Sequence, residues 1–204
     1  DCEDLIPYSH KRDDPIHELP ASLYRALDEF IIARAIRNLR GQASKHCSMM
    51  VNVSRFVPVQ KAVRDFLSLR EKKIREAVLA NYAMPEEVSA RNAYMQGLKH
   101  AFDAEYADAG FTWAEVKAAL SGVFEHLHLY VINSKSDEVL DYTRYEKQGV
   151  GLTAVEIGKR HIGEIDQRED EGAASVALHR MPRVFEAELD LCCHGGMLRA
   201  LRYQ

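Results

Sequence analysis

The 204-residue sequence predicts an α/β fold in which a parallel sheet is joined mainly by helices. Three short apolar segments, residues 48–54, 127–133 and 152–157, each end in a polar or glycine turn. Apolar runs of this length that are bounded by polar residues are typical of strands buried in a parallel sheet. Long segments with apolar residues at helical spacing separate the first two strands, as expected for strand–helix–strand units.

The first 41 residues are predicted to form an extended lead-in followed by a helix. Residues 1–19 are polar and punctuated by proline, so we expect this lead-in to lie along a surface. The helix should begin near Pro20, because proline suits a first helical turn, and Gly41 is its expected stop. Its apolar stripe consists of Leu23, Leu27, Phe30, Ile31, Ile36 and Leu39.

A second helix is predicted over residues 59–81, directly after the first strand and a short polar turn. Its apolar stripe consists of Val59, Val63, Phe66, Leu67, Ile74 and Val78. Residues 86–125 are expected to be helical in at least two pieces, which Gly110 separates. Thr112 and Glu115 have the spacing of a capping box at the start of the second piece.

Composition and charge exclude several classes of protein. Hydrophobic residues make up 47% and charged residues 28% of the chain, as in an ordinary globular protein. No apolar run is long enough to cross a bilayer, and the first residues lack the features of a signal peptide. We therefore expect no membrane partner. Four cysteines in a chain of this length do not form a disulfide framework, so we also expect a cytoplasmic protein. The absence of an initiator Met suggests a piece of a longer protein.

The net charge is only −4, but residues 34–75 are rich in cations and residues 86–146 are rich in carboxylates. We call the cations of the first region the basic block; they are Arg34, Arg37, Arg40, Lys45, Arg55, Lys61, Arg64, Arg70, Lys72, Lys73 and Arg75. A basic block beside a sheet edge is a candidate surface for phosphate contacts. A solvated helix face balanced by an acidic one is the alternative, and charge alone leaves both open.

The common catalytic and metal-binding motifs do not fit this chain. The nearest approach to a phosphate-binding loop, Gly158-Lys159-Arg160, lacks the hydroxyl residue and the upstream glycine. Cys192-Cys193-His194 has no second ligand pair at a zinc-like spacing, so no metal site is predicted. Glu115-Val116-Lys117 matches a nuclease Glu-x-Lys motif by letters, but it falls in the first turn of a helix, where Glu115 has a capping role. No catalytic residue can therefore be assigned.

Polar residues at the ends of two predicted strands are the best candidates for a binding site. Ser54 and Arg55 follow the first strand, and Asn133, Ser134 and Lys135 follow the second. The carboxyl ends of parallel strands meet at one edge of a sheet, where ligands gather. Hydroxyls, amides and cations suit the phosphate oxygens of a nucleic-acid backbone, so we predict that these five residues bind nucleic acid. Ordinary turn chemistry is the alternative.

Three ordered sequence blocks resemble the Z-one endonuclease domain family. The first runs from Leu19-Pro20-Ala21-Ser22-Leu23 to Ala35-Ile36-Arg37-Asn38-Leu39-Arg40-Gly41. The second is His46-Cys47-Ser48-Met49-Met50-Val51-Asn52-Val53-Ser54-Arg55-Phe56, followed by the helix with Val59 and Gln60. The third joins Val131-Ile132-Asn133-Ser134-Lys135-Ser136 to Leu140-Asp141-Tyr142. The resemblance covers roughly residues 5–158, and the ordered set is more specific than any single block.

The resemblance implies a bacterial protein related to superfamily-two helicases and found with restriction and phage-defence genes. It implies a helix-rich, RecA-like (P-loop-type) parallel sheet with helical insertions, incomplete in this chain, over residues 20–158. The strand at residues 48–54 would be the first strand of a second RecA-like domain, whose end touches the nucleic acid. ATP and Mg would then bind the full-length protein through a loop upstream of Asp1, with DNA and defence-system proteins as partners.

The chain departs from the family after the third strand. The family continues with two glycines, an asparagine and a Leu-Ser-Arg-Gly-Leu-Thr run, whereas Ile157-Gly158 is followed here by Lys159-Arg160-His161-Ile162. We therefore expect residues 159–204 to be a divergent or non-native tail. The leading hypothesis is a fragment of an ATP-dependent nucleic-acid-processing protein, a hydrolase of endonuclease type that is inactive as this fragment alone. A non-catalytic α/β protein-interaction module and a free-standing metal hydrolase are the alternatives.

Overall fold

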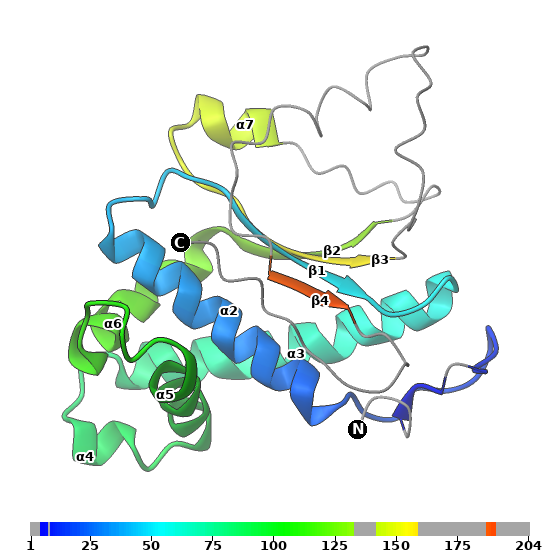
Figure 1. The fold of residues 1–204 in the computed structure, drawn as a ribbon, viewed down its shortest axis with the longest axis horizontal. Helices are drawn as coiled ribbons and strands as arrows, with labels where there is room; N and C mark the ends of the chain where they lie inside the picture. Colours follow the sequence, from blue (N-terminus) through cyan, green and yellow to red (C-terminus); the bar gives the residue numbers. More distant parts are fainter. Residues whose placement is uncertain (1–4, 8, 133–141, 159–186, 191–204) are drawn as a thin grey trace.

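The computed structural model describes residues 5–7, 9–132, 142–158 and 187–190, which form a mixed α/β fold (Figure 1). Its helices are α2 (Ala21–Leu39), α3 (Val57–Asn81), α4 (Glu86–Ser89), α5 (Ala93–Glu105), α6 (Trp113–Ala119), the 3-10 helix η1 (Leu120–His126) and α7 (Tyr142–Lys147). Its strands are β1 (Cys47–Asn52), β2 (Leu127–Ile132), β3 (Thr153–Gly158) and β4 (Ala187–Asp190).

The strands form a parallel sheet in the order β2-β3-β1-β4. β3 is central to the three predicted strands, and its Thr153 is in register with Cys47 on one side and Leu127 on the other. The prediction of a parallel α/β sheet is therefore confirmed. β1 and β2 end one or two residues before the predicted positions, so Ser54 belongs to the turn between β1 and α3.

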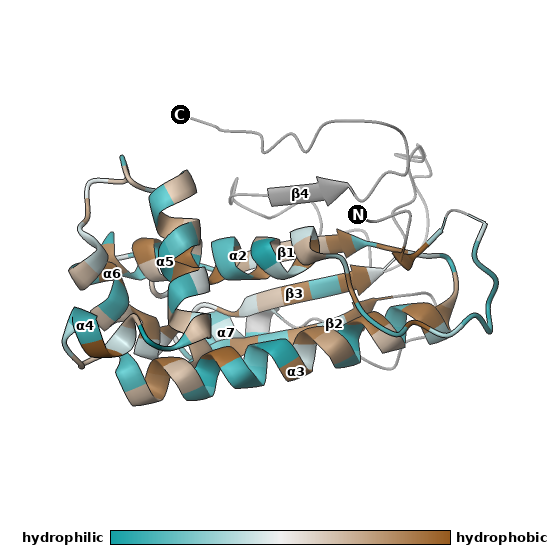
Figure 2. Ribbon diagram, turned by 90° about the horizontal axis from the view of Figure 1, so that it is seen from below, coloured by the Kyte–Doolittle hydropathy of each residue, from teal (hydrophilic) through white to brown (hydrophobic). Residues whose placement is uncertain are grey.

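The two faces of the sheet differ in chemistry because side chains alternate along each strand. Figure 1 shows α2, α3, α5 and α6 on one side of the sheet and α7 on the other. The face toward the larger helical layer is apolar, and Met49, Val51 and Val155 on it are fully buried. The opposite face is more polar, and there the Tyr142 hydroxyl of α7 donates a hydrogen bond to a carboxylate oxygen of Glu156 at 2.8 Å. Figure 2 shows apolar (brown) and polar (teal) residues alternating along the ribbon of α3.

The helix boundaries follow the local sequence signals. α2 begins directly after Pro20, and Gly41 beyond its end has a φ of +73°, which favours glycine. Leu39 is exposed, so the predicted apolar stripe of α2 ends one turn earlier than expected. α3 starts at Val57, two residues before the predicted start, and Pro58 lies in its first turn.

Residues 86–126 form four short helical pieces, in agreement with the prediction of at least two. Gly110 separates α5 from α6 and has a φ of +84°. The capping box is confirmed, because the Thr112 N–H donates to Glu115 Oε2 at 2.7 Å and the Glu115 N–H donates to Thr112 Oγ1 at 3.3 Å. None of the helices in the described part of the chain combines the length and the apolar character that a bilayer span requires.

Arg34 of α2 joins the amino-terminal edge of the sheet to the helical layer. Its side chain is buried, and its guanidinium donates to the backbone oxygens of Lys45 at 2.7 Å, Ala43 at 2.8 Å and Gly151 at 3.3 Å. Nearby, the Leu152 N–H donates to Nδ1 of His46 at 3.0 Å. Burial lowers the pKa of His46, which keeps this nitrogen available as an acceptor. The start of β1 and the start of β3 are thus held together by side-chain hydrogen bonds before the ladder between them begins.

The division of the chain at residues 19 and 158 stays a prediction. Ile6 and Leu19 of the lead-in are buried in the hydrophobic core, so this segment contacts the domain at two points. Apart from β4, the predicted tail of residues 159–204 lies outside the described residues. The possible metal motif at residues 192–194 lies outside them as well.

We predict that Gly151→Ala destabilises the fold. A Cβ at this position would overlap the backbone oxygen of Lys45 and lie 2.6 Å from that of Ala43, and backbone atoms cannot move aside as a flexible side chain can. Overpacking of this kind typically costs about 1–3 kcal/mol or more. Urea unfolding should therefore show a large loss in the free energy of unfolding.

Gly122→Ala is the matched control, because nothing lies within 4 Å of a Cβ at that helical position. The control should leave stability unchanged or slightly raised, since alanine favours helix over glycine. Equal effects of the two substitutions would contradict the close packing at Gly151.

Candidate nucleic-acid interface

The turn between β1 and α3 is held by hydrogen bonds to Ser54. The Phe56 N–H donates to Ser54 Oγ at 3.0 Å, and the side-chain amide of Gln60 donates to the Ser54 backbone oxygen at 2.7 Å. Ser54 and Gln60 are 7% and 1% exposed. The turn therefore has a fixed shape, and the predicted site residue Ser54 lies within it and not on the open surface.

A second contact joins this turn to the lead-in. His10 Nε2 lies 2.7 Å from Ser54 Oγ, and His10 Nδ1 lies 2.6 Å from the Pro7 backbone oxygen. Because a carbonyl can only accept, Nδ1 carries the proton that is donated to Pro7. In the neutral ring Nε2 then accepts from the Ser54 hydroxyl. The sequence does not single out His10, since 44 positions separate the two residues and no local pattern marks the pair.

The His10–Ser54 pair has the distance expected of a base and a nucleophile, but its surroundings are those of a structural contact. Ser54 is nearly buried, and its oxygen already accepts the Phe56 N–H. Among the described residues, only Gly41, Gly110 and Gly149 are glycines with positive φ, so no strained glycine turn presents Ser54 to a substrate.

Arg55 has the opposite placement from Ser54, although both residues lie in the turn between β1 and α3. It is exposed, and its guanidinium carbon lies 4.8 Å from the centre of the Phe56 ring. Phe56 also forms a T-shaped pair with the His10 ring, at 5.7 Å between ring centres. No carboxylate in the described part of the chain pairs with Arg55. Phe56 therefore supports a cation that is free to meet an anion from solvent.

The amino terminus of α3 adds positive potential at the same place. α3 is 25 residues long, and its N-cap residue, Phe56, provides no side-chain hydrogen bond to the first turn. Pro58 in the first turn has no N–H to donate, but the helix dipole still favours anions at such a position. Lys61 is exposed one turn further along. The β1–α3 turn thus combines two exposed cations with a helix amino terminus.

The second predicted strand end directly follows β2, which ends at Ile132. Asn133, Ser134 and Lys135 lie outside the described residues. Ile132, which precedes them, is in register with Gly158 and through it with Asn52. The chain therefore leaves β2 at the same edge of the sheet as β1, and the contribution of these three residues to binding stays a prediction.

Several cations of the basic block have partners within the protein. Arg34 is buried on backbone carbonyls, as described above. Arg70 bonds Asp28 at 2.8 Å and lies over the rings of Tyr24 and Tyr94, with its guanidinium carbon 5.4 Å and 5.0 Å from the ring centres. Three further members, Lys61, Lys72 and Lys73, are exposed along α3. The surface available to phosphate is therefore smaller than the sequence suggests, and Arg55 is at its sheet end.

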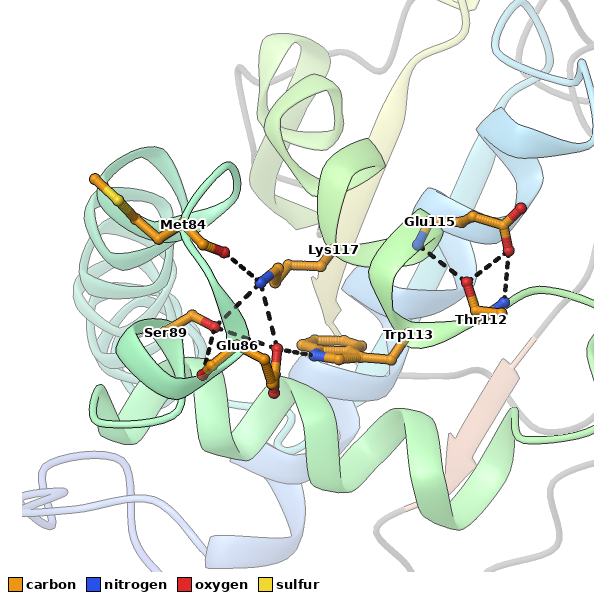
Figure 3. Close-up of polar contacts among 7 residues, drawn as sticks. All are labelled: Met84, Glu86, Ser89, Thr112, Trp113, Glu115 and Lys117. Atoms are coloured by element: carbon orange, nitrogen blue, oxygen red, sulfur yellow. Dashed lines mark hydrogen bonds and ion pairs between the residues drawn. The ribbon is translucent and has the colours of Figure 1, made fainter.

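The nuclease-like Glu115–Lys117 spacing serves structure, as Figure 3 shows. Lys117 is buried, and its ammonium donates to the Met84 backbone oxygen at 2.7 Å, to Ser89 Oγ at 3.2 Å and to Glu86 Oε2 at 3.3 Å. Glu115 is occupied by the capping box. The two side chains therefore do not converge on a common site, as expected from their place in a helix.

Other reactive groups also lack the surroundings of an active site. Cys47 is a buried free thiol, and burial raises its pKa, which disfavours the reactive thiolate. His126 and His128 both lie near the Tyr145 ring, at 6.1 Å and 6.3 Å between ring centres. Within the described ranges, no group of three His, Cys, Asp or Glu residues has a geometry that could hold a metal ion.

Asp28 should make stability depend on pH, because its carboxylate is buried. Burial raises the pKa of Asp28 to about 6, although the Arg70 guanidinium acts in the opposite direction. The folded state therefore binds this proton more tightly than the unfolded state does. The free energy of unfolding should fall as the pH rises from about 4 to about 6, by roughly 3 kcal/mol for this residue.

Asp28→Asn removes the titration while keeping a hydrogen-bond acceptor for Arg70. Urea unfolding of the variant and of the native chain across that pH range gives their free energies of unfolding. As the pH rises, the variant should become more stable relative to the native chain. A difference that stays constant would show that Asp28 does not titrate there.

The family assignment follows from comparison with known proteins. A family model for the Z1 (Z-one) domain matches residues 22–162, which is more than half of the chain. No curated protein and no solved structure matches the chain. The matched range includes nearly all of α2, the β1–α3 turn and the strands β1, β2 and β3. The chain belongs to the Z1 domain family.

Proposed function

We propose that this domain is part of an ATP-dependent nucleic-acid-processing protein and contacts a DNA backbone through the β1–α3 turn. The observation that carries the proposal is the placement of Arg55, which is exposed, lies against Phe56 and precedes the uncapped amino terminus of α3. A phosphate group at this turn would meet a guanidinium and the positive end of the α3 dipole together. Such contacts fix the position of a duplex without reading its sequence.

The family resemblance extends the proposal to the longer protein. We propose a RecA-like, helicase-related enzyme of a bacterial restriction or phage-defence system, located in the cytoplasm and assembled with other defence proteins. Its ATP and Mg would require a phosphate-binding loop, and the sequence of this chain contains none. No residue here is therefore assigned to the nucleotide, to the metal or to cleavage of DNA. The contribution of this chain is to bind and orient the nucleic acid.

The DNA-binding proposal predicts a salt-dependent interaction that Arg55→Ala weakens. Affinity for double-stranded and single-stranded oligonucleotides, measured by fluorescence anisotropy, should fall steeply with salt because counterions are released. Arg55→Ala should weaken binding to about the same degree for every sequence and reduce the salt slope by about 1.

Arg91→Ala is the matched control, because Arg91 is also exposed but lies in the segment between α4 and α5. Its removal should have a much smaller effect than the removal of Arg55. Binding that is insensitive to salt, or equal losses from the two substitutions, would argue against the β1–α3 turn as the contact.

A protein-interaction module is the second candidate function, favoured by exposed apolar residues around the end of α3 and the start of α4. Leu79, Tyr82, Met84 and Val88 are 56%, 37%, 48% and 44% exposed. Scattered exposed apolar residues are normal, whereas several near one another favour a protein contact. Pull-down of partner proteins with and without nuclease treatment separates the two functions. Partners that survive the treatment and are lost with Leu79→Asp would favour the interaction module.

A further inference from the structure

The lead-in lies against the turn that is proposed to bind DNA. Its two core contacts, Ile6 at 3% exposure and Leu19 at 3% exposure, fix it at both ends. Between them, His10 contacts Ser54, and its ring forms a T-shaped pair with the ring of Phe56. In Figure 1 the lead-in (blue) runs beside the end of β1 and the start of α3. We call residues 9–19 the strap.

The hydrogen bonds of Ser54 leave no room for a second acceptor. A serine hydroxyl has one proton to donate, and the neutral His10 ring takes it at Nε2. On its acceptor side, Ser54 Oγ is engaged by the Phe56 N–H. A phosphate oxygen is an acceptor and would need the same proton. His10 and a phosphate group are therefore alternative partners for Ser54.

The strap does not mimic DNA by charge. Its cations Lys11 and Arg12 are followed directly by Asp13 and Asp14, and the Lys11 N–H donates to the Asp14 carboxylate at 2.7 Å. Its charges are mixed, so it offers Arg55 no strongly anionic surface. Competition with a phosphate group would act through the hydrogen bond to Ser54 and through the space that His10 occupies beside Phe56.

We propose that the strap is an autoinhibitory element that DNA must displace from the β1–α3 turn. This inference rests on the proposed function, because it concerns the same surface. The strap holds Ser54 in its buried position when nucleic acid is absent. Release of His10 frees the hydroxyl for a phosphate oxygen and opens the turn beside Arg55.

The first test is the affinity of the 204-residue chain for a labelled double-stranded oligonucleotide of mixed sequence at low salt. His10→Ala should tighten binding roughly three- to tenfold, since one hydrogen bond no longer has to be broken. His17→Ala, a histidine substitution at an exposed position of the same strap, should leave the affinity unchanged. In a Ser54→Ala background His10→Ala should no longer increase the affinity, because the hydroxyl for which His10 and phosphate compete is absent.

The second test uses the native chain and needs no substitution. Trypsin cleaves after Lys11 and Arg12, which are exposed in the strap, and mass spectrometry can follow the product. Added oligonucleotide should accelerate this cleavage if it displaces the strap. Cleavage that is unchanged or slower, under conditions where anisotropy shows bound DNA, would contradict the displacement of the strap. It would not affect the proposed function.

The two proposals can fail separately. If no form of the chain binds DNA at low salt, including His10→Ala, both are wrong. If the native chain and His10→Ala bind equally well, and both are folded by circular dichroism, only the autoinhibitory strap is wrong. Faster cleavage with DNA together with a gain that depends on Ser54 would support both.

Discussion

The buried guanidinium of Arg34 is the contact on which the arrangement of this domain depends. One side chain from α2 reaches the backbone of the loop before β1 and the backbone before β3, which are distant in sequence. Burial of an unpaired guanidinium would be costly, so the carbonyls must stay in place around it. Gly151 allows the approach, because any larger residue would fill the space of the carbonyls. The position of α2 and the pairing of β1 with β3 are consequently set together.

The cations of the basic block are divided between internal contacts and the surface. Basic residues can form contacts inside a protein or carry charge on its surface, and the arginines of this block do both. Arg34 and Arg70 hold helices and strands together, while Arg55 remains available on the outside. Exposed positive charge therefore remains at Arg55, where β1 ends and α3 begins, and at Lys61, Lys72 and Lys73 along α3.

Local patterns in the sequence were sufficient to predict most of the elements. The capping box at Thr112, the proline at the start of α3 and the three apolar strand segments depend only on near neighbours, and the structure contains all of them. Contacts between distant positions could not be predicted in this way. His10 with Ser54, and Lys117 with Glu86, bring together residues that no spacing rule connects. Ser54 and Arg55 are adjacent and both polar, yet one is nearly buried and the other exposed, because the path of the backbone decides which side each faces.

The central place of β3 has a consequence for how the chain reaches this structure. His46 before β1 and Leu152 before β3 are 106 positions apart, and β2 also pairs with β3. Neither β1 nor β2 can join the sheet until residues 153–158 have been synthesised. Contacts of such long range make folding slow, and strands that wait for a partner expose edges that promote aggregation. A chain shortened before β3 would lose the sheet as a whole and not only one strand. Because β1 and β2 stay unpaired until β3 has been made, we expect this domain to depend on chaperones during its synthesis.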